Sequence, residues 1–130
     1  MTEILIVEDE FLVALDLEDI VAGAGFRVIG IVADRESAQT VTGAPQLALV
    51  DLNLRDGPTG LDIAHELAER HGTTIIFVTA NPAQITNPPG TAIGFIQKPF
   101  AANTIESSLA FALGTASASA TPPYGLQPFA

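Results

Sequence analysis

The chain has 130 residues, 48% of them hydrophobic, and carries five basic against fifteen acidic side chains. This length suits one domain with a single core, and the net charge of −10 argues against binding nucleic acid or anionic membranes. The lack of cysteine excludes disulfides and fits a reducing compartment. Because neither a signal peptide nor an apolar run of roughly 20 residues is visible, we expect a soluble, cytoplasmic protein.

Short apolar runs alternate with segments of helical spacing along the chain. The runs are rich in Val and Ile and lack the polar alternation of half-exposed strands, so they predict strands covered on both faces. The expected strands are residues 4–7, 28–32, 47–50, 75–78 and the shorter 95–96. The expected helices are residues 11–24, 35–42, 61–71 and 104–113. This alternation predicts an α/β fold, with a parallel sheet and helices on both of its faces.

Local signals set the boundaries and buried faces of these helices. Thr59 is the expected start signal of the third helix, and Asn103 is the expected cap of the last one. The first helix has a broad apolar face made of Leu12, Leu15, Ile20 and Val21. His65 and His71 fall in or at the end of the third helix, and we interpret both as surface residues.

The segment before the last expected strand departs from the helical pattern. It holds Pro82, Pro88, Pro89 and Gly90, and Ile85 is its main apolar residue. A proline serves only the first turn of a helix, and later prolines stop it. A helix in residues 81–94 should therefore be short, irregular or absent, and the segment should be the least stable part of the domain.

The composition changes again near the end of the chain. From residue 115 the sequence is small, Pro-rich and uncharged, which is typical of a flexible segment. We therefore expect one domain, residues 1–114, followed by a flexible tail, residues 115–130. Tyr124, Leu126 and Phe129 leave docking of the tail on an apolar surface as the alternative.

Residues with functional chemistry stand at the ends of four expected strands. Glu8 and Asp9 follow the first strand, Asp51 the third, and Thr79 the fourth, while Lys98, the only lysine, follows the fifth. In a five-stranded, doubly wound sheet of order 2-1-3-4-5, these ends meet at the ligand-binding edge. Converging carboxylates repel one another unless a cation joins them, and Mg²⁺ suits a few carboxylates with retained water. A lysine serves a phosphoryl group as a point charge.

These residues occur in the order of a known family. The sequence resembles the receiver domains of two-component response regulators over residues 3 to 113. The resemblance rests on Glu8–Asp9, "DLNL" at Asp51, Thr79–Ala80 and Lys98–Pro99. Each motif is weak alone, and together they are specific. The resemblance implies the flavodoxin-like fold. The family normally has its fourth helix in the segment of residues 81–94, and here that helix would be degenerate. The segments "IFVTAN" and "DLNLRDGPTG" are similar to those of a divergent subgroup of receivers, named after a Phe-Ala-Thr-Gly motif. That subgroup often works with histidine kinases of the HWE and related classes.

The resemblance implies a role for each residue of the expected site. Asp51 would be the phosphoacceptor, and Thr79 and Lys98 would hold the phosphoryl oxygens. The implied Mg²⁺ ligands are Asp9, Asp51, Glu8 and the backbone carbonyl of Asn53. Thr79 would act as a switch together with Phe95, for which a plain core aromatic is the alternative. The Lys98–Pro99 bond is expected to be cis.

The implied function is that of a stand-alone, single-domain response regulator. It would accept a phosphoryl group from a histidine kinase and act by protein contact with a downstream partner or as a phosphate sink. Slow self-dephosphorylation would not make it an enzyme. The alternative is a phosphorylation-independent, protein-binding pseudo-receiver, which usually lacks the acceptor, an acid or the lysine. An aspartate-dependent phosphatase is disfavoured because Asn53 stands where such an enzyme needs an acid.

Overall fold

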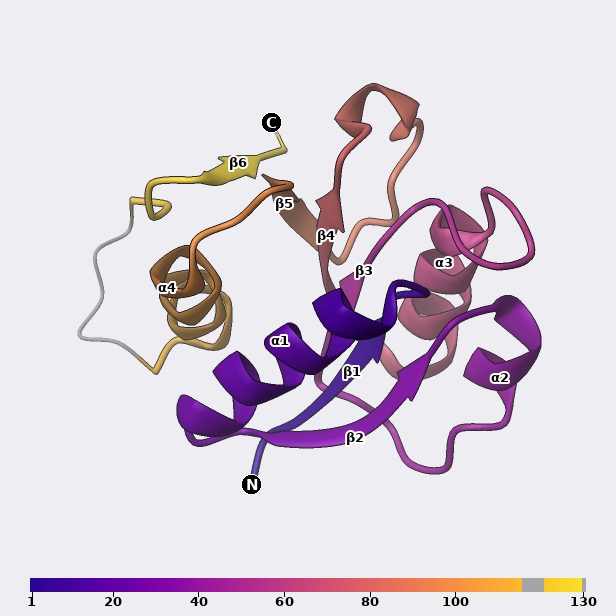
Figure 1. Ribbon diagram of the computed structural model, residues 1–130, viewed down its shortest axis with the longest axis horizontal. Coiled ribbons are helices and arrows are strands. Elements are labelled where there is room, and N and C mark those ends of the chain that lie inside the picture. The colour runs from indigo at the N-terminus through magenta and orange to yellow at the C-terminus, as the bar shows by residue number, and fades with distance from the viewer. Residues whose placement is uncertain (116–120, 130) are drawn as a thin grey trace.

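Figure 1 shows the protein as a computed structural model, which describes residues 1–115 and 121–129. In this part of the chain the strands are β1 (Glu3–Val7), β2 (Arg27–Val32), β3 (Leu47–Val50), β4 (Thr74–Thr79), β5 (Ala92–Gln97) and β6 (Leu126–Pro128). The α-helices described are α1 (Phe11–Gly23), α2 (Arg35–Gln39), α3 (Gly60–His71) and α4 (Ala102–Leu113). The strands form one sheet in the order β2-β1-β3-β4-β5-β6. The order of β1 to β5 confirms the predicted doubly wound sheet.

Helices cover both faces of the sheet. In Figure 1, α1 and α4 lie over one face, while α2 and α3 lie over the other. The central strands contribute side chains to both helix layers. Ile4 and Ile6 of β1 pack with α1 and α4, and Leu5 and Val7 pack with α3. Burying one such side chain contributes about 1.5–3 kcal/mol. The two cores therefore fix the parallel strands, and their carboxyl ends meet at one edge. Among the described helices, none combines the length and hydropathy that a membrane crossing requires.

The burial of two elements differs from the prediction. Helix α1 buries Ala14, Leu17 and Val21, whereas Leu12 is 79% exposed and Leu15 is 36% exposed. Because α1 is apolar around most of its circumference, the spacing alone does not select the buried face. Strand β2 is half-exposed along most of its length rather than covered on both faces, because it is an edge strand beside the short α2.

The structure confirms one of the two expected helix starts and corrects the other. Thr59 occupies the N-cap position of α3, although its hydroxyl donates to Asp56 Oδ1 at 2.5 Å and makes no capping hydrogen bond. Helix α4 begins at Ala102, so Asn103 lies inside the first turn and Ala101 occupies the N-cap position. The error at Asn103 concerns a boundary, because both helices form where the sequence places them.

The segment between β4 and β5 holds the predicted degenerate helix. It contains a single 3₁₀ turn, η1 (Pro82–Gln84), with Pro82 in its first turn, and Ile85 is already extended. This confirms the prediction that a helix in residues 81–94 is short and irregular. Whether the segment is the least stable part of the domain stays a prediction.

The expected flexible tail is wrong for part of its length. Leu126–Pro128 form β6, which pairs antiparallel with β5, and Leu126 is 3% exposed. The pairing is possible because β5 would otherwise be the open edge of the sheet. Residues 116–120 and 130 lie outside the described residues. The domain boundary after residue 114 stays a prediction, although β6 belongs to the same sheet.

Candidate functional site

The carboxyl ends of β1 and β3 place two carboxylates side by side. Val7 and Val50 are register partners in these strands, so the residues that follow them, Glu8 and Asp51, are neighbours. The Asp51 amide donates to the Val7 carbonyl at 2.9 Å, and the Glu8 amide donates to the Val32 carbonyl at 2.9 Å. Backbone pairing of the central strands thus holds both residues at the sheet edge.

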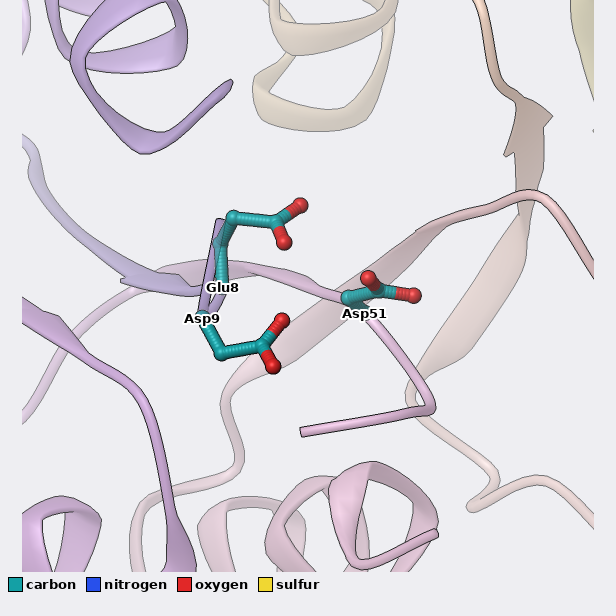
Figure 2. Close-up of side chains that lie close together, drawn as sticks. All are labelled: Glu8, Asp9 and Asp51. Atoms are coloured by element: carbon teal, nitrogen blue, oxygen red, sulfur yellow. The ribbon is translucent and has the colours of Figure 1, made fainter. Parts of the chain in front are cut away.

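Asp9 completes a cluster of three acids. One carboxylate oxygen of each of Glu8, Asp9 and Asp51 lies within 4.8 Å of the others. Figure 2 shows the three side chains, with Glu8 and Asp9 in the turn after β1 and Asp51 opposite them at the end of β3. Glu8 is 2% exposed and Asp51 is 7% exposed, while Asp9 is open to solvent. The cluster is therefore buried on one side and accessible on the other.

Lys98 reaches the cluster from the end of β5. Its Nζ lies 2.7 Å from Glu8 Oε1 and 2.9 Å from Asp51 Oδ2, and 3.8 Å from Glu10 Oε1. Burial acts to lower the pKa of Lys98, but its bonds to Glu8 and Asp51 outweigh burial and hold that pKa above its ordinary value. The ammonium therefore stays charged between two carboxylates. The Lys98–Pro99 bond is cis, as expected.

Burial has the opposite consequence for Glu8. It raises the pKa of this carboxyl to about 7, although the hydrogen bonds from Lys98 and from the Glu10 amide act against the rise, and the charge of Asp51 adds to it. The Glu10 amide donates to Glu8 Oε2 at 3.1 Å. Burial is thus the main reason that this carboxyl holds its proton more tightly, and a cation bound at the cluster would favour its charged form.

Two contacts orient the carboxylate of Asp51, and Gly60 packs against the Asp51 backbone. The Leu52 amide donates to Asp51 Oδ1 at 2.7 Å, while Lys98 pairs with the other oxygen. Gly60, the first residue of α3, packs so closely that a Cβ there would lie 1.9 Å from the Asp51 carbonyl oxygen. Sequence reasoning missed Gly60, because a glycine after "DGPT" is equally typical of a turn.

The remaining predicted residues lie around this cluster. Thr79 is fully buried at the end of β4, and its Oγ1 accepts a hydrogen bond from the Asn81 amide at 3.0 Å. The Asn53 side chain donates to Gln84 Oε1 of η1 at 2.8 Å. The structure thus brings Glu8, Asp9, Asp51 and Lys98 together, and the side-chain hydrogen bonds of Thr79 and Asn53 point elsewhere. No signal in the sequence identified the Asn53–Gln84 contact.

Phe95 lies farther along β5 and does not belong to the acid cluster. It is half-buried, and its ring packs against Phe129 with 6.2 Å between centroids. Sequence reasoning named Phe129 as a residue that could dock the tail on an apolar surface, but it did not identify Phe95 as the partner.

The donor set fits Mg²⁺. The cluster offers carboxylate oxygens from three residues within 4.8 Å of one another, and hard oxygen ligands are those that Mg²⁺ prefers, together with retained water. Burial raises the pKa of Glu8 and the charge of Asp51 adds to the rise, and a cation bound at the cluster would act against both. The acidic cluster is therefore compatible with magnesium binding.

Comparisons with known proteins agree with this geometry. A profile of the response regulator receiver domain matches residues 4–110. The phyllosphere-induced regulator PhyR of Methylorubrum extorquens is 38% identical over 116 residues, covering 86% of this chain and 43% of that protein. The solution structure of the PhyR receiver domain of Erythrobacter litoralis superposes with a TM-score of 0.79 at 32% identity, covering 91% of this chain and 94% of that chain.

A second structure extends the comparison to a longer protein. The anti-anti-sigma factor PhyR of Bartonella quintana superposes with a TM-score of 0.70 at 30% identity, covering 88% of this chain and 48% of that chain. The chain spans about half the length of the curated relatives that it matches. The profile match, the sheet order and the acids and lysine at the strand ends lead to one conclusion: the chain belongs to the family of response regulator receiver domains of two-component signalling.

Proposed function

We propose that Asp51 accepts a phosphoryl group from a histidine kinase, of the HWE or a related class, in a Mg²⁺-dependent reaction. One observation carries the proposal: the Lys98 ammonium bridges Glu8 and Asp51 at distances of 2.7 and 2.9 Å. The acceptor carboxylate thus already has a partly buried cation beside it, and Asp9 supplies a third acid at the solvent side. Such a constellation suits the transfer of an anionic group to an anion.

The transfer exchanges one bond for another. An oxygen of the Asp51 carboxylate attacks the phosphorus of a phosphohistidine, the O–P bond forms, and the N–P bond breaks with its electron pair returning to the imidazole. A carboxylate nucleophile has no proton to lose as it attacks, so the step needs no general base. Lys98 offsets the repulsion between the two anions. Mg²⁺, held by Glu8, Asp9, Asp51 and the Asn53 backbone carbonyl, would supply further positive charge against that repulsion.

Thr79 ends β4 at the same edge of the sheet, which supports a role in binding the product. Its hydroxyl oxygen accepts from the Asn81 amide at 3.0 Å, which leaves the hydroxyl proton to donate to a phosphoryl oxygen. Lys98 is the second ligand of the phosphoryl group, because its ammonium lies next to Asp51 Oδ2. Slow hydrolysis of the aspartyl phosphate by water then resets the protein without making it an enzyme.

The output of the phosphorylated protein is contact with a downstream protein or removal of phosphate from the kinase. The relative from Bartonella quintana is described as an anti-anti-sigma factor. The present chain corresponds to about half of that protein, and the receiver step is the function proposed for it.

Intact mass spectrometry tests the acceptor. With acetyl phosphate and Mg²⁺, the wild type should gain one phosphoryl group, and Asp51→Asn should not. Asp19→Asn is the matched control, because Asp19 is an exposed carboxylate on α1, and it should behave as the wild type does. Equal phosphorylation of Asp51→Asn would place the acceptor elsewhere. A wild type that gains no phosphoryl group from acetyl phosphate or from a histidine kinase would favour a phosphorylation-independent binding module.

Asp9→Asn tests the metal. Removing one ligand carboxylate should raise the Mg²⁺ concentration needed for half-maximal phosphorylation about tenfold or more, the range seen when support of a metal site is removed. The same titration on Asp19→Asn supplies the reference. An unchanged titration in Asp9→Asn would move the metal away from this cluster.

A further inference from the structure

Strand β6 runs along the outer edge of β5. Figure 1 shows it beside β5 at the end of the sheet. It pairs antiparallel with Gly94, Phe95 and Ile96, and the Phe129 amide donates to the Ile93 carbonyl at 3.0 Å. These are the residues of β5 that lead directly into the Lys98 side of the acid cluster.

The ring of Phe129 packs on the apolar cluster that includes Phe77, Phe95 and Ile85. Its centroid lies 6.2 Å from that of Phe77 in an edge-on arrangement, and 6.2 Å from that of Phe95. The segment before β5 supplies only the three-residue η1 in this region, and Phe129 packs on the same apolar cluster as Ile85. Two aromatic contacts therefore hold the end of β6 on the sheet.

Gly94 allows β6 to approach this closely. A Cβ on Gly94 would lie 2.3 Å from the Gln127 carbonyl oxygen, and its three nearest neighbours all belong to Gln127 and Pro128. An alanine at this position would therefore push β6 away from β5. Gly94 does not have a positive φ, so its backbone conformation does not itself require glycine. The substitution thus acts on the contact with β6.

β5 connects this contact with the phosphoryl site. The ring of Phe95 packs against Phe129, and Gln97, two residues on, is the register partner of Thr79. The Lys98 amide donates to the Thr79 carbonyl at 3.0 Å. If Thr79 and Lys98 are drawn toward a phosphoryl group on Asp51, the end of β5 moves with them, and Phe95 cannot keep its ring contact with Phe129 unchanged.

We propose that residues 126–129 form a displaceable cap on β5 and that phosphorylation of Asp51 weakens its docking. This inference rests on the proposed function, because it requires Asp51 to take the phosphoryl group. By thermodynamic reciprocity, a docked cap weakens binding of the phosphoryl group or its mimic by the same factor. The cap is thus an autoinhibitory contact. Its release exposes the backbone edge of β5 and the rings of Phe77 and Phe95, a surface that accepts an extended apolar segment of another chain.

Amide hydrogen exchange on the full chain tests the coupling. The probe is beryllofluoride with Mg²⁺, and its bound state is monitored independently by fluorine NMR. The Phe129 amide should exchange several-fold faster once the mimic is bound, while amides of the central β1 stay unchanged. If no bound fluorine signal appears, the proposed function fails. If the mimic binds and the Phe129 amide keeps its protection, the cap proposal alone is overturned.

Two variants test the reverse direction of the coupling. Gly94→Ala displaces β6 by its Cβ, and Phe129→Ala removes both ring contacts, so each should bind beryllofluoride about two- to tenfold more tightly, the range that an aromatic contact supplies. Tyr124→Ala is the control, because Tyr124 is 96% exposed on the same segment, and its affinity should equal that of the wild type. Should Gly94→Ala fail to fold, Phe129→Ala carries the test. Unchanged or weaker binding in the folded variants contradicts the proposal.

Discussion

The acid cluster and the β6 cap lie at two different edges of one sheet and are held in different ways. The cluster sits on the central strands β1 and β3, where backbone hydrogen bonds and ion pairs hold Glu8 and Asp51, and Gly60 packs closely against the Asp51 backbone. The cap sits on the outermost strand and is held by a short antiparallel pairing, Leu126 and two ring contacts. A region fixed by the core preorganises chemistry, whereas a region held by few edge contacts is suited to moving.

The first prediction concerns the packing under the cluster and has the largest expected effect on stability. Gly60→Ala should lower the free energy of unfolding by about 3 kcal/mol, the upper end for overpacking, because its Cβ would lie 1.9 Å from the Asp51 carbonyl oxygen. Gly23→Ala is the matched control, since no atom lies within 4 Å of a Cβ there. It should be neutral or stabilising by at most about 1 kcal/mol. Urea unfolding of both variants measures this, and equal stability would contradict the close packing.

The second prediction concerns the cap and is somewhat smaller. Leu126→Ala should cost about 2–3 kcal/mol, the lower part of the range for a buried leucine, because Leu126 is 3% exposed among side chains of α1 and α4. Tyr124→Ala should change stability by less than about 0.5 kcal/mol, as exposed positions do. Thermal melts compare the two. A Leu126→Ala melt that matches the control would return this segment to the flexible tail expected from the sequence.

The third prediction concerns a local contact, the N-cap of α2, and has the smallest expected effect on stability. Asp34 Oδ1 accepts the Ser37 amide at 2.8 Å and caps α2, and the hydrogen bonds from Ser37 hold the pKa of this carboxyl below its usual value. Because the folded-state pKa is depressed, the contribution of Asp34 is present above its ordinary pKa and is lost as pH falls through the lowered value. Asp34→Ala should therefore lower the melting temperature near neutral pH, by less than Leu126→Ala does.

The pH dependence separates the loss of the Asp34 N-cap on α2 from other effects of Asp34→Ala. The loss should shrink toward zero as the carboxyl becomes protonated in the wild type at strongly acidic pH. Melts of wild type and Asp34→Ala across that range supply the measurement. If the difference in melting temperature between the two proteins stayed the same in acid, the charge of Asp34 would have no part in capping α2.

The parts of the structure that could be predicted from the sequence are those with local signals. An apolar run that ends in a charge marks a strand end, so Glu8, Asp51 and Lys98 could be placed at one edge once a parallel sheet was inferred. The prolines likewise predicted the degenerate helix that η1 confirms. In these cases neighbouring residues carry the whole signal.

The parts that could not be predicted depend on contacts between distant segments. Strand β6 pairs Gly94 with Pro128, and its sequence offers little strand signal, because proline is disfavoured in strands except at edges. The exposed Leu12 follows from the packing of α1 rather than from its spacing. Gly60 and Gln84 act through partners on other elements. Such residues are found only when the chain is folded.

The most direct test of the central claim, that Asp51 is the phosphoacceptor beside Lys98, is chemical mapping of the phosphorylated residue. Borohydride reduces an aspartyl phosphate to homoserine, which peptide mass spectrometry locates. After treatment with acetyl phosphate and Mg²⁺, homoserine should occur at position 51 in the wild type and at no position in Asp51→Asn. Homoserine at another position, or reduction at position 51 that does not depend on the phosphodonor, would contradict the account.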